Sequence, residues 1–334
     1  MFSKRPDRIR LEASSYCQLR CPSCPTAIGT IDAAVGRGFL SASDFEKLLD
    51  KNPFVREIEL SNYGEILLNP QLPAILETAH SRGVVMRADN GVNLNSASEL
   101  VLDAIVRYGL RSMTCSVDGA SNETYKQYRV RGSFDRVIAN IRRLNELKAQ
   151  YRSPFPIITW QFIVFGHNEH ELPEARAMAR DLDMVFFAKL NWDPKFSPIK
   201  DRDLVARELG MAEVTREEYK KKNSEDYMVS ICHQLWESPQ INWDGKVLGC
   251  CRNFWGDFGG NAFTEGLRES VNSETMSYAR AMLQGEQPAR DDIPCTTCEI
   301  YLGMRESGRW LDRGRRGRLE GVLARFRKLG MPGR

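Results

Sequence analysis

The sequence predicts an α/β fold: a partial barrel of six βα units, followed by a small cysteine-bearing C-terminal domain and a basic helical tail. Short β-rich runs alternate with longer helical patterns from residue 8 to about residue 190. This is the order expected of a parallel sheet with crossover helices. The composition then changes, and five cysteines follow between residues 232 and 298. The segment from residue 305 to the C-terminus is strongly basic.

Six short segments have the composition of strands, and the segments between them have helical periodicity. Ser41 begins one helical segment, because Asp44 three residues later completes a plausible cap before an apolar run. Six units predict a partial barrel rather than a closed eightfold one, with the chemistry at the C-terminal ends of the strands. The predicted strands are 9–13, 57–61, 84–89, 112–117, 157–165 and 185–190. The other predicted helices lie near 71–81, 96–108, 134–148 and 171–181.

The predicted division of the chain follows these changes in composition. Residues 1–191 form the barrel, and residues 192–231 form a polar, irregular bridging region with one short helix. Residues 232–302 form the second cysteine-bearing domain, and residues 303–334 form the tail.

The composition is that of a soluble globular protein. The chain has 334 residues, of which 42% are hydrophobic. It has no apolar run approaching the ~20 residues that span a bilayer. No secretory signal is visible, so a cytoplasmic location is expected. Nine cysteines in tight groups then predict metal ligands rather than disulfides.

The positive charge is concentrated in the tail. The whole chain carries +3, but from Arg305 to Arg334 ten basic residues face three acidic ones, which gives 10 − 3 = +7. Leu319, Val322, Leu323 and Phe326 recur at helical spacing. We expect an amphipathic helix docked on the body of the protein. Nucleic acid, a membrane surface or a phosphorylated substrate are less favoured partners of this tail.

Three thiols lie directly after the first predicted strand, at Cys17, Cys21 and Cys24. Thiolates are preferred ligands of iron-sulfur clusters and of zinc, and this spacing lets one loop surround one inorganic core. The loop supplies three ligands and no fourth, so a four-iron cluster held here would keep one iron open for another ligand. A zinc loop or reactive thiols are the alternatives for this motif alone.

The pattern Cys-x3-Cys-x2-Cys resembles the radical S-adenosylmethionine (SAM) superfamily, and motifs at later strand ends strengthen the resemblance. Tyr63-Gly64-Glu65 is similar to the family's Gly-Gly-Glu segment, with Tyr63 in place of the first glycine. Asn90 belongs to a segment similar to Thr-Asn-Gly. Further matches are Ser116 and Asp118 after the fourth strand, Arg131 in the following basic run, and Asn168 after the fifth strand.

The resemblance implies a role for each of these residues. Glu65 would accept a hydrogen bond from the SAM ammonium group, and Arg131 would reach the SAM carboxylate. Ser116 and Asp118 would face the SAM pocket or the substrate, and Asn168 would contact the ribose. Ser23 departs from the family, which usually has an aromatic residue in this position, and this puts the adenine contact in doubt.

The second set of thiols consists of Cys232, Cys250, Cys251 and the pair Cys295 and Cys298. A four-cysteine zinc site is one interpretation. The arrangement also resembles the twitch domain, a shortened SPASM domain, with intervals like those of the 2-deoxy-scyllo-inosamine dehydrogenases. This resemblance implies one auxiliary four-iron cluster, because no cysteine follows Cys298. Its ligands would be Cys232, Cys250, Cys295 and Cys298.

Two thiols remain outside both ligand sets. Cys251 follows a ligand directly, and adjacent side chains on a strand point to opposite faces. It is either a packed small hydrophobe or the donor of a hydrogen atom to a substrate radical, the role of a cysteine in related sugar epimerases. Cys115, within the fourth strand, is expected in the core.

The resemblance implies reductive cleavage of SAM and removal of a hydrogen atom from the substrate by the resulting 5′-deoxyadenosyl radical. We expect dehydrogenation or epimerisation at a carbinol carbon of a small polar substrate, such as a sugar, an aminoglycoside or a nucleotide sugar. The chain begins only about a dozen residues before the thiol loop, so we expect no N-terminal peptide-recognition domain. The expected cofactors are two 4Fe-4S clusters and SAM, with flavodoxin or ferredoxin as electron donor. The alternatives are a maturase acting on a ribosomal peptide and a non-catalytic iron-sulfur or zinc protein that binds nucleic acid.

Overall fold

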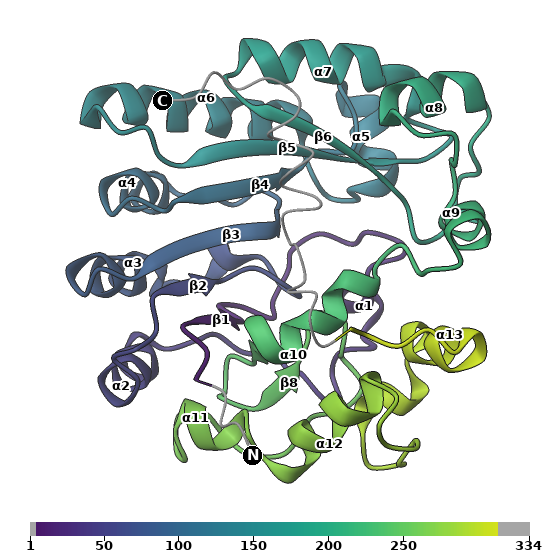
Figure 1. The fold of residues 1–334 in the computed structure, drawn as a ribbon. Helices are drawn as coiled ribbons and strands as arrows, with labels where there is room; N and C mark the ends of the chain where they lie inside the picture. Colours follow the sequence, from purple (N-terminus) through teal and green to yellow (C-terminus); the bar gives the residue numbers. More distant parts are fainter. Residues whose placement is uncertain (1–4, 313–334) are drawn as a thin grey trace.

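A computed structural model describes residues 5–312 of the chain, and its main feature is a curved sheet of eight strands. The order across the sheet is β6-β5-β4-β3-β2-β1-β7-β8 (Figure 1). The first six strands are parallel, which confirms the predicted partial barrel. These strands are β1 (Arg8–Leu11), β2 (Glu57–Glu59), β3 (Val85–Val92), β4 (Ser112–Ser116), β5 (Ile157–Val164) and β6 (Val185–Leu190).

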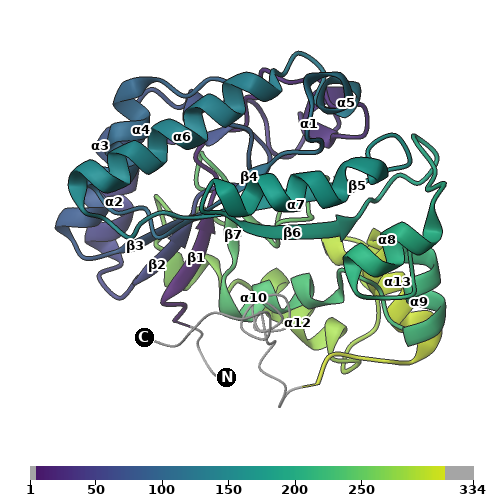
Figure 2. The same cartoon turned by 90° about the horizontal axis from the view of Figure 1, so that it is seen from above.

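Helices cover the outer side of the curved sheet (Figure 2). Ser41 accepts a hydrogen bond from the Asp44 amide at 3.0 Å and so begins α2 where the sequence predicts it. The covering helices are α2 (Ala42–Lys51), α3 (Leu72–Ser81), α4 (Glu99–Arg107), α6 (Phe134–Tyr151) and α7 (Leu172–Asp181). Two shorter helices, α1 (Pro25–Ile28) and α5 (Asn122–Tyr128), lie in loops that follow strands, as do the 3-10 turns η1 (Ile66–Leu68) and η2 (Glu169–Glu171).

The two faces of the sheet differ in polarity. Alternate strand residues, among them Ile58, Met113 and Trp160, pack outward into the core beneath the helices. Because successive strand side chains point to opposite faces, the residues between them face inward. These include Glu59, Arg87, Asp89, Ser116, Gln161 and Lys189. The interior of the barrel is therefore lined with polar groups.

The bridging region holds two helices, α8 (Arg202–Leu209) and α9 (Arg216–Asn223), where the sequence predicted one. Each has a side-chain cap, from Asp201 and Thr215 respectively, and the apolar content of α9 is too low to signal a helix by periodicity. The predicted tail residues Leu319, Val322, Leu323 and Phe326 lie outside the described residues. No helix in the described part of the chain is long and apolar enough to cross a membrane.

The C-terminal segment continues the same sheet. Strand β7 (Gln240–Ile241) pairs in parallel with β1, and β8 (Val247–Gly249) pairs antiparallel with β7 as a hairpin. The Tyr63 hydroxyl, on the loop after β2, donates to the Asn253 carbonyl at 2.6 Å. The rest of this segment consists of η3 (Val229–His233), α10 (Gln234–Glu237), α11 (Leu267–Ser270), α12 (Glu274–Leu283), η4 (Pro294–Thr297) and α13 (Glu299–Ser307).

The bond from Tyr63 to Asn253 predicts a measurable contribution to stability. In Tyr63→Phe the Asn253 carbonyl loses its donor, and we expect the free energy of unfolding to fall by about 1 kcal/mol. Anaerobic urea unfolding of the purified protein measures this. Tyr16→Phe is the matched control, because this ring is 40% exposed. Equal stabilities of the two variants would contradict the assignment.

Candidate functional site

The first thiol loop leaves the end of β1 and turns back over the barrel. Cys21 is buried, whereas Cys17 and Cys24 are half-buried. Leu19, Tyr128, Ile163 and Phe165 pack around the loop. The Cys24 amide donates to the Cys21 carbonyl at 3.1 Å, and Cys24 occupies the N-cap position of α1. The three thiols are thus gathered at one apolar patch at the C-terminal ends of the strands.

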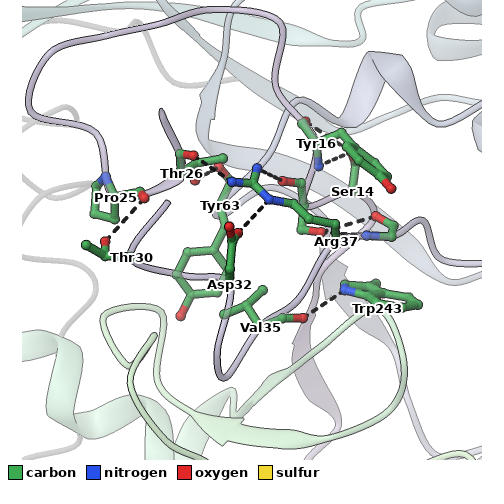
Figure 3. Close-up of polar contacts among 12 residues, drawn as sticks. Ser14, Tyr16, Pro25, Thr26, Thr30, Asp32, Val35, Arg37, Tyr63 and Trp243 are labelled. Carbon is green, nitrogen blue, oxygen red and sulfur yellow. Dashed lines mark hydrogen bonds and ion pairs between the residues drawn. The ribbon is translucent and has the colours of Figure 1, made fainter. Parts of the chain in front are cut away.

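Arg37 fixes the segment that follows the thiols (Figure 3). Its guanidinium donates to the Thr26 carbonyl at 2.9 Å and to the Asp32 carboxylate at 2.6 Å. Ser15 and Gly38 exchange hydrogen bonds close to the start of the loop. The loop is therefore closed by polar contacts at its base and is not free to unfold around the thiols.

Two side chains donate to the sulfur atoms. Asn93 Nδ2 lies 3.7 Å from Cys17 Sγ, and Arg129 Nη1 lies 3.7 Å from Cys21 Sγ. Burial raises the pKa of Cys17 to about 12 and also raises the pKa of Cys21. A coordinating metal deprotonates such thiols outright, and hydrogen bonds to cluster sulfurs tune a bound cluster. The residues present thus fit an iron-sulfur cluster.

The turn after β2 is held from beneath by Glu12. Its carboxyl group accepts hydrogen bonds from the Tyr63 and Gly64 amides at 3.1 to 3.2 Å. A Cβ at Gly64 would lie 2.1 Å from the Ser14 carbonyl oxygen, so only glycine fits there. Burial raises the pKa of Glu12 to about 8.

Glu65 is also buried, and it connects this turn to the next loop. Its two oxygens accept from the Leu67 amide at 3.1 Å and the Asn93 amide at 2.6 Å. Burial raises its pKa to about 7. Asn93 also donates to Cys17, so it connects Glu65 to the thiol loop. A carboxylate with these two hydrogen bonds keeps further lone pairs for a ligand.

The residues predicted after β3 and β4 lie at different depths. Asn90 is exposed and donates to the Asn62 side chain at 2.7 Å. Ser116 is buried and accepts from Gln161 Nε2 at 3.4 Å. Asp118 is fully buried and accepts from Arg129 Nε at 2.6 Å and from the Ile163 amide at 2.7 Å.

Arg129, rather than Arg131, is the arginine that the structure places at the thiols. Arg131 is exposed, in a left-handed conformation with φ 71°. Arg129 forms an ion pair with Asp118 at 2.6 Å and reaches Cys21. The sequence run Arg129-Val130-Arg131 contained both candidates, and a buried aspartate partner distinguishes them only in three dimensions.

Asn168 is fully buried and its side chain holds backbone groups. The amide nitrogen donates to the Asp118 and Ile163 carbonyls at 3.2 and 3.0 Å, and the side-chain oxygen accepts from the Phe165 amide at 2.8 Å. It therefore joins the loops after β4 and β5, and its side-chain hydrogen bonds go to the protein backbone.

The departure at Ser23 is accompanied by contacts from the loop after β6. Ser23 Oγ donates to Asp193 at 2.5 Å, and Trp192 Nε1 donates to the Ser23 carbonyl at 3.1 Å. The Trp192 ring lies edge-on to Tyr128, with centroids 6.4 Å apart. An aromatic ring absent from the thiol loop is thus supplied from the adjacent segment.

The second set of thiols lines one cavity. Cys232, Cys250, Cys295 and Cys298 lie around it, together with apolar side chains and Arg252. Arg252 donates to Glu299 at 2.8 Å through Nη2, but its buried Nε has no hydrogen-bond partner. A free buried donor beside four thiols suits a cluster whose sulfur atoms accept hydrogen bonds.

Cys251 is held apart from that cavity. Its amide donates to Gln234 Oε1 at 2.8 Å, and Gln234 Nε2 lies 3.5 Å from its sulfur. It is absent from the described lining residues of the four-thiol cavity. Cys115 lies in the core beneath the helices, as expected.

Within residues 5–312 no three or more His, Cys, Asp and Glu side chains are grouped so that they could hold a metal ion. A single zinc ion draws its ligand sulfurs to within about 2.3 Å of one point. In a four-iron cluster each thiolate binds a different iron atom.

Sequence reasoning missed three residues that shape the site: Glu12, Asn93 and Arg129. Glu12 could have been found, because a glutamate at the end of an apolar strand demands a partner. The contacts of the others join segments distant in sequence, as between Arg129 and Cys21.

Comparison with protein families gives two matches. The model of the radical SAM superfamily matches residues 11–179, about half of the chain. The model of the SPASM iron-sulfur cluster-binding domain matches residues 232–299.

Two curated proteins resemble the chain in sequence. It is 27% identical over 189 residues to the AdoMet-dependent heme synthase of Methanosarcina barkeri. The aligned region covers 56% of this chain and 50% of that protein. It is 26% identical over 190 residues to the GTP 3′,8-cyclase of Chlorobaculum tepidum. The aligned region covers 55% of this chain and 53% of the cyclase. The chain thus spans about half the length of these relatives.

Solved structures resemble the chain at lower identity. SuiB of Streptococcus suis bound to S-adenosylmethionine has a TM-score of 0.62 and 14% identity, covering 89% of this chain and 72% of SuiB. BtrN in complex with AdoMet and 2-DOIA has a TM-score of 0.50 and 14% identity, covering 89% and 94%. At these identities the likeness shows a shared fold.

The raised pKa of Glu12 predicts a dependence of stability on pH. In the folded state the pKa of the Glu12 carboxyl group is about 8, whereas in the unfolded state it has its ordinary value of 4.5. Glu12 thus binds this proton more tightly in the folded protein. Its contribution is therefore complete below about pH 4.5 and is lost as the pH rises to about 8. The free energy of unfolding of the wild type should fall by on the order of a few kcal/mol over this pH range, and Glu12→Gln should remove this fall.

Urea unfolding between pH 5 and 8 under anaerobic conditions measures this decline. Glu123→Gln, at an exposed position of α5, is the control and should follow the wild type. If the slope of Glu12→Gln equals that of the wild type, Glu12 does not titrate in this range.

Proposed function

The chain belongs to the radical SAM superfamily, and from this premise we propose that it removes a hydrogen atom from a carbinol carbon of a sugar-derived or aminocyclitol substrate, with dehydrogenation or epimerisation as the outcome. The family match confirms the resemblance seen in the sequence, including the SPASM/twitch domain. The cofactors are a 4Fe-4S cluster with SAM and an auxiliary 4Fe-4S cluster in the SPASM domain. When bound, the first cluster and SAM supply a 5′-deoxyadenosyl radical.

We assign Cys17, Cys21 and Cys24 to the SAM-binding cluster. Arg129 and Asn93 donate to two of these sulfurs and offset their negative charge when they are thiolates. Glu65 and the turn at Gly64 remain the proposed holders of the SAM amino group. For the carboxylate, Arg129 is better placed than Arg131, because it is fixed by Asp118 next to the thiols.

Ser116, Asp118, Asn90 and Asn168 remain proposed residues of the SAM and substrate region. Ser116 faces the polar inner side of the sheet, whereas Asp118 and Asn168 act by fixing Arg129 and the strand-end loops. Asn90 is the most exposed of the four.

We assign Cys232, Cys250, Cys295 and Cys298 to the auxiliary cluster, since they line one cavity. In dehydrogenation this cluster would accept the electron that the substrate radical gives up as it loses a proton. In epimerisation a thiol outside the ligand set would return a hydrogen atom, and Cys251 is the candidate, because it is separate from the cavity that the other four thiols line.

The polar inner face of the barrel is the observation that favours a small polar substrate. Ser116, Gln161 and Lys189 project inward from the three adjacent strands β4, β5 and β6. Such groups bond hydroxyls, amines and phosphates. The structure of BtrN was solved with 2-DOIA, and its fold matches this chain across 94% of its length.

A peptide substrate is the second candidate. SuiB in complex with its precursor peptide SuiA has a TM-score of 0.60 and 12% identity, covering 82% of this chain and 66% of SuiB. The relatives named as a heme synthase and a cyclase match 56% and 55% of this chain. We propose a flavodoxin or ferredoxin as electron donor and the cytoplasm as location.

The proposed chemistry predicts SAM cleavage that depends on the first thiol set. Anaerobically reconstituted protein should hold about eight irons, from two four-iron clusters, and release 5′-deoxyadenosine on reduction. The triple Cys17, Cys21 and Cys24→Ala variant should lose SAM cleavage and about half of the iron. Cys115→Ala is the control, because this buried thiol belongs to the core. Stoichiometric zinc without SAM cleavage would refute the proposed enzymatic activity.

Deuterium transfer distinguishes a sugar from a peptide substrate. A candidate nucleotide sugar labelled at its carbinol carbons should pass deuterium into 5′-deoxyadenosine, as detected by mass spectrometry. Label transfer from a peptide alone would establish the second candidate instead.

The role of Cys251 predicts a change of product. If Cys251 donates hydrogen, Cys251→Ala should still cleave SAM but should convert an epimerised product into an oxidised one, because the radical can lose an electron but cannot regain hydrogen. Product analysis by mass spectrometry measures the ratio. Continued formation of the epimer by Cys251→Ala would rule out the donor role.

A further inference from the structure

Lys189 occupies the inner face of β6 at the C-terminal end of the barrel. Phe186 and Ala188 pack outward against the core, and Arg176 of α7 lies 4.7 Å from the centre of the Phe186 ring. Because side chains alternate along a strand, Lys189 faces inward. It stands in register with Ile163, which packs against the Cys21 loop. Its side chain therefore points into the polar interior of the barrel, on the same face as Ile163.

Arg216, at the start of α9, lies beside the same strand end. Its Nε and Nη2 donate to the Leu190 carbonyl at 3.3 and 3.1 Å. Its guanidinium lies 5.0 Å from the Tyr227 ring centre and 5.9 Å from that of Trp192. These contacts fix the position of the charge and leave other guanidinium donors for a ligand, since arginine carries five.

The two cations lack carboxylate partners at bonding distance. Among residues 5–312, neither Lys189 nor Arg216 forms a salt bridge within 4 Å. The nearby Asp118 is already bound by Arg129 and the Ile163 amide. Burial and the Arg216 charge lower the pKa of Lys189 to about 8, and burial also lowers the pKa of Arg216. Both side chains are half-buried, and removing a cation from water without a counterion is costly, so an anion brought by a ligand would stabilise both.

We propose that Lys189 and Arg216 form a subsite that binds an anionic group of the substrate, a phosphate or a carboxylate. The inference rests on the proposed function, since it places the substrate between the two clusters. It makes Lys189 a specificity-determining residue, because it selects substrates by charge. Neither residue is needed to ligate a cluster.

Equilibrium dialysis of reconstituted protein with labelled inorganic phosphate or labelled acetate tests the subsite without knowledge of the substrate. With SAM saturating, wild-type protein should bind one further anion that Lys189→Met does not bind. We expect the dissociation constant to rise about 10- to 100-fold in Lys189→Met and in Arg216→Met, and to recover partly in Lys189→Arg. Tighter binding of phosphate or of acetate identifies which group the substrate carries.

Lys195→Met is the matched control, because it removes an exposed lysine from the following loop. If Lys189→Met binds as many anions as the wild type with the same affinity, the anions occupy another surface and the inference is wrong. If saturating SAM displaces the anion, Lys189 serves the SAM carboxylate, and the assignment to the substrate is overturned.

Release of 5′-deoxyadenosine is measured on the same samples. Anion binding without SAM cleavage would refute the proposed function while leaving the subsite intact. SAM cleavage without Lys189-dependent anion binding would refute the subsite alone.

Discussion

Buried carboxyl groups that accept hydrogen bonds from backbone amides hold the loops of this barrel together. Each one joins the end of one strand to the next segment. Glu12 binds the turn after β2, Glu65 binds the Asn93 amide after β3, and Asp118 binds the Ile163 amide in β5. Glu171 and Glu169 extend the series, through the Ala120 amide and through the amides at 200 and 201. Loops that would otherwise move independently thus form one connected rim.

This rim explains how three flexible thiol side chains come to lie in a defined geometry. Cys17 receives a hydrogen bond from Asn93, which Glu65 holds, and Cys21 receives one from Arg129, which Asp118 holds. The groups that contact sulfur are therefore each fixed by a buried carboxyl group. Preorganisation of this kind keeps a site within the tolerance that its chemistry requires.

Much of the barrel was predictable, because its strands and helices have local signals. The cap at Ser41 and the alternation of strands and helices correctly gave the order of the elements. The pairing of β7 with β1 was not predictable, since two residues at positions 240–241 join a strand more than 200 residues earlier. Likewise, α9 has almost no apolar residues, and its formation depends on its Thr215 cap and on the Arg216 contacts.

The grouping of the cysteines was predictable from the sequence, and the residues that contact them were less so. Thiol spacing identified two groups of cysteines that the structure brings to two places. The choice between Arg129 and Arg131 depended on burial, because the two lie only two positions apart and have the same chemistry. Asn168 matched a ribose-binding position by its place after β5, yet its side-chain hydrogen bonds go to the backbone.

The pairing of β7 with β1 also bears on how two clusters could act on one substrate. The strand that leads into the first thiol loop is hydrogen-bonded to the hairpin that leads into Cys250. The Tyr63 hydroxyl joins the turn after β2 to the Asn253 carbonyl, three residues beyond Cys250. A shift of either thiol set would strain these shared bonds. The shared sheet thus links the positions of the two thiol sets, and the inner residues Ser116, Gln161 and Lys189 lie on strands β4, β5 and β6 of that same sheet.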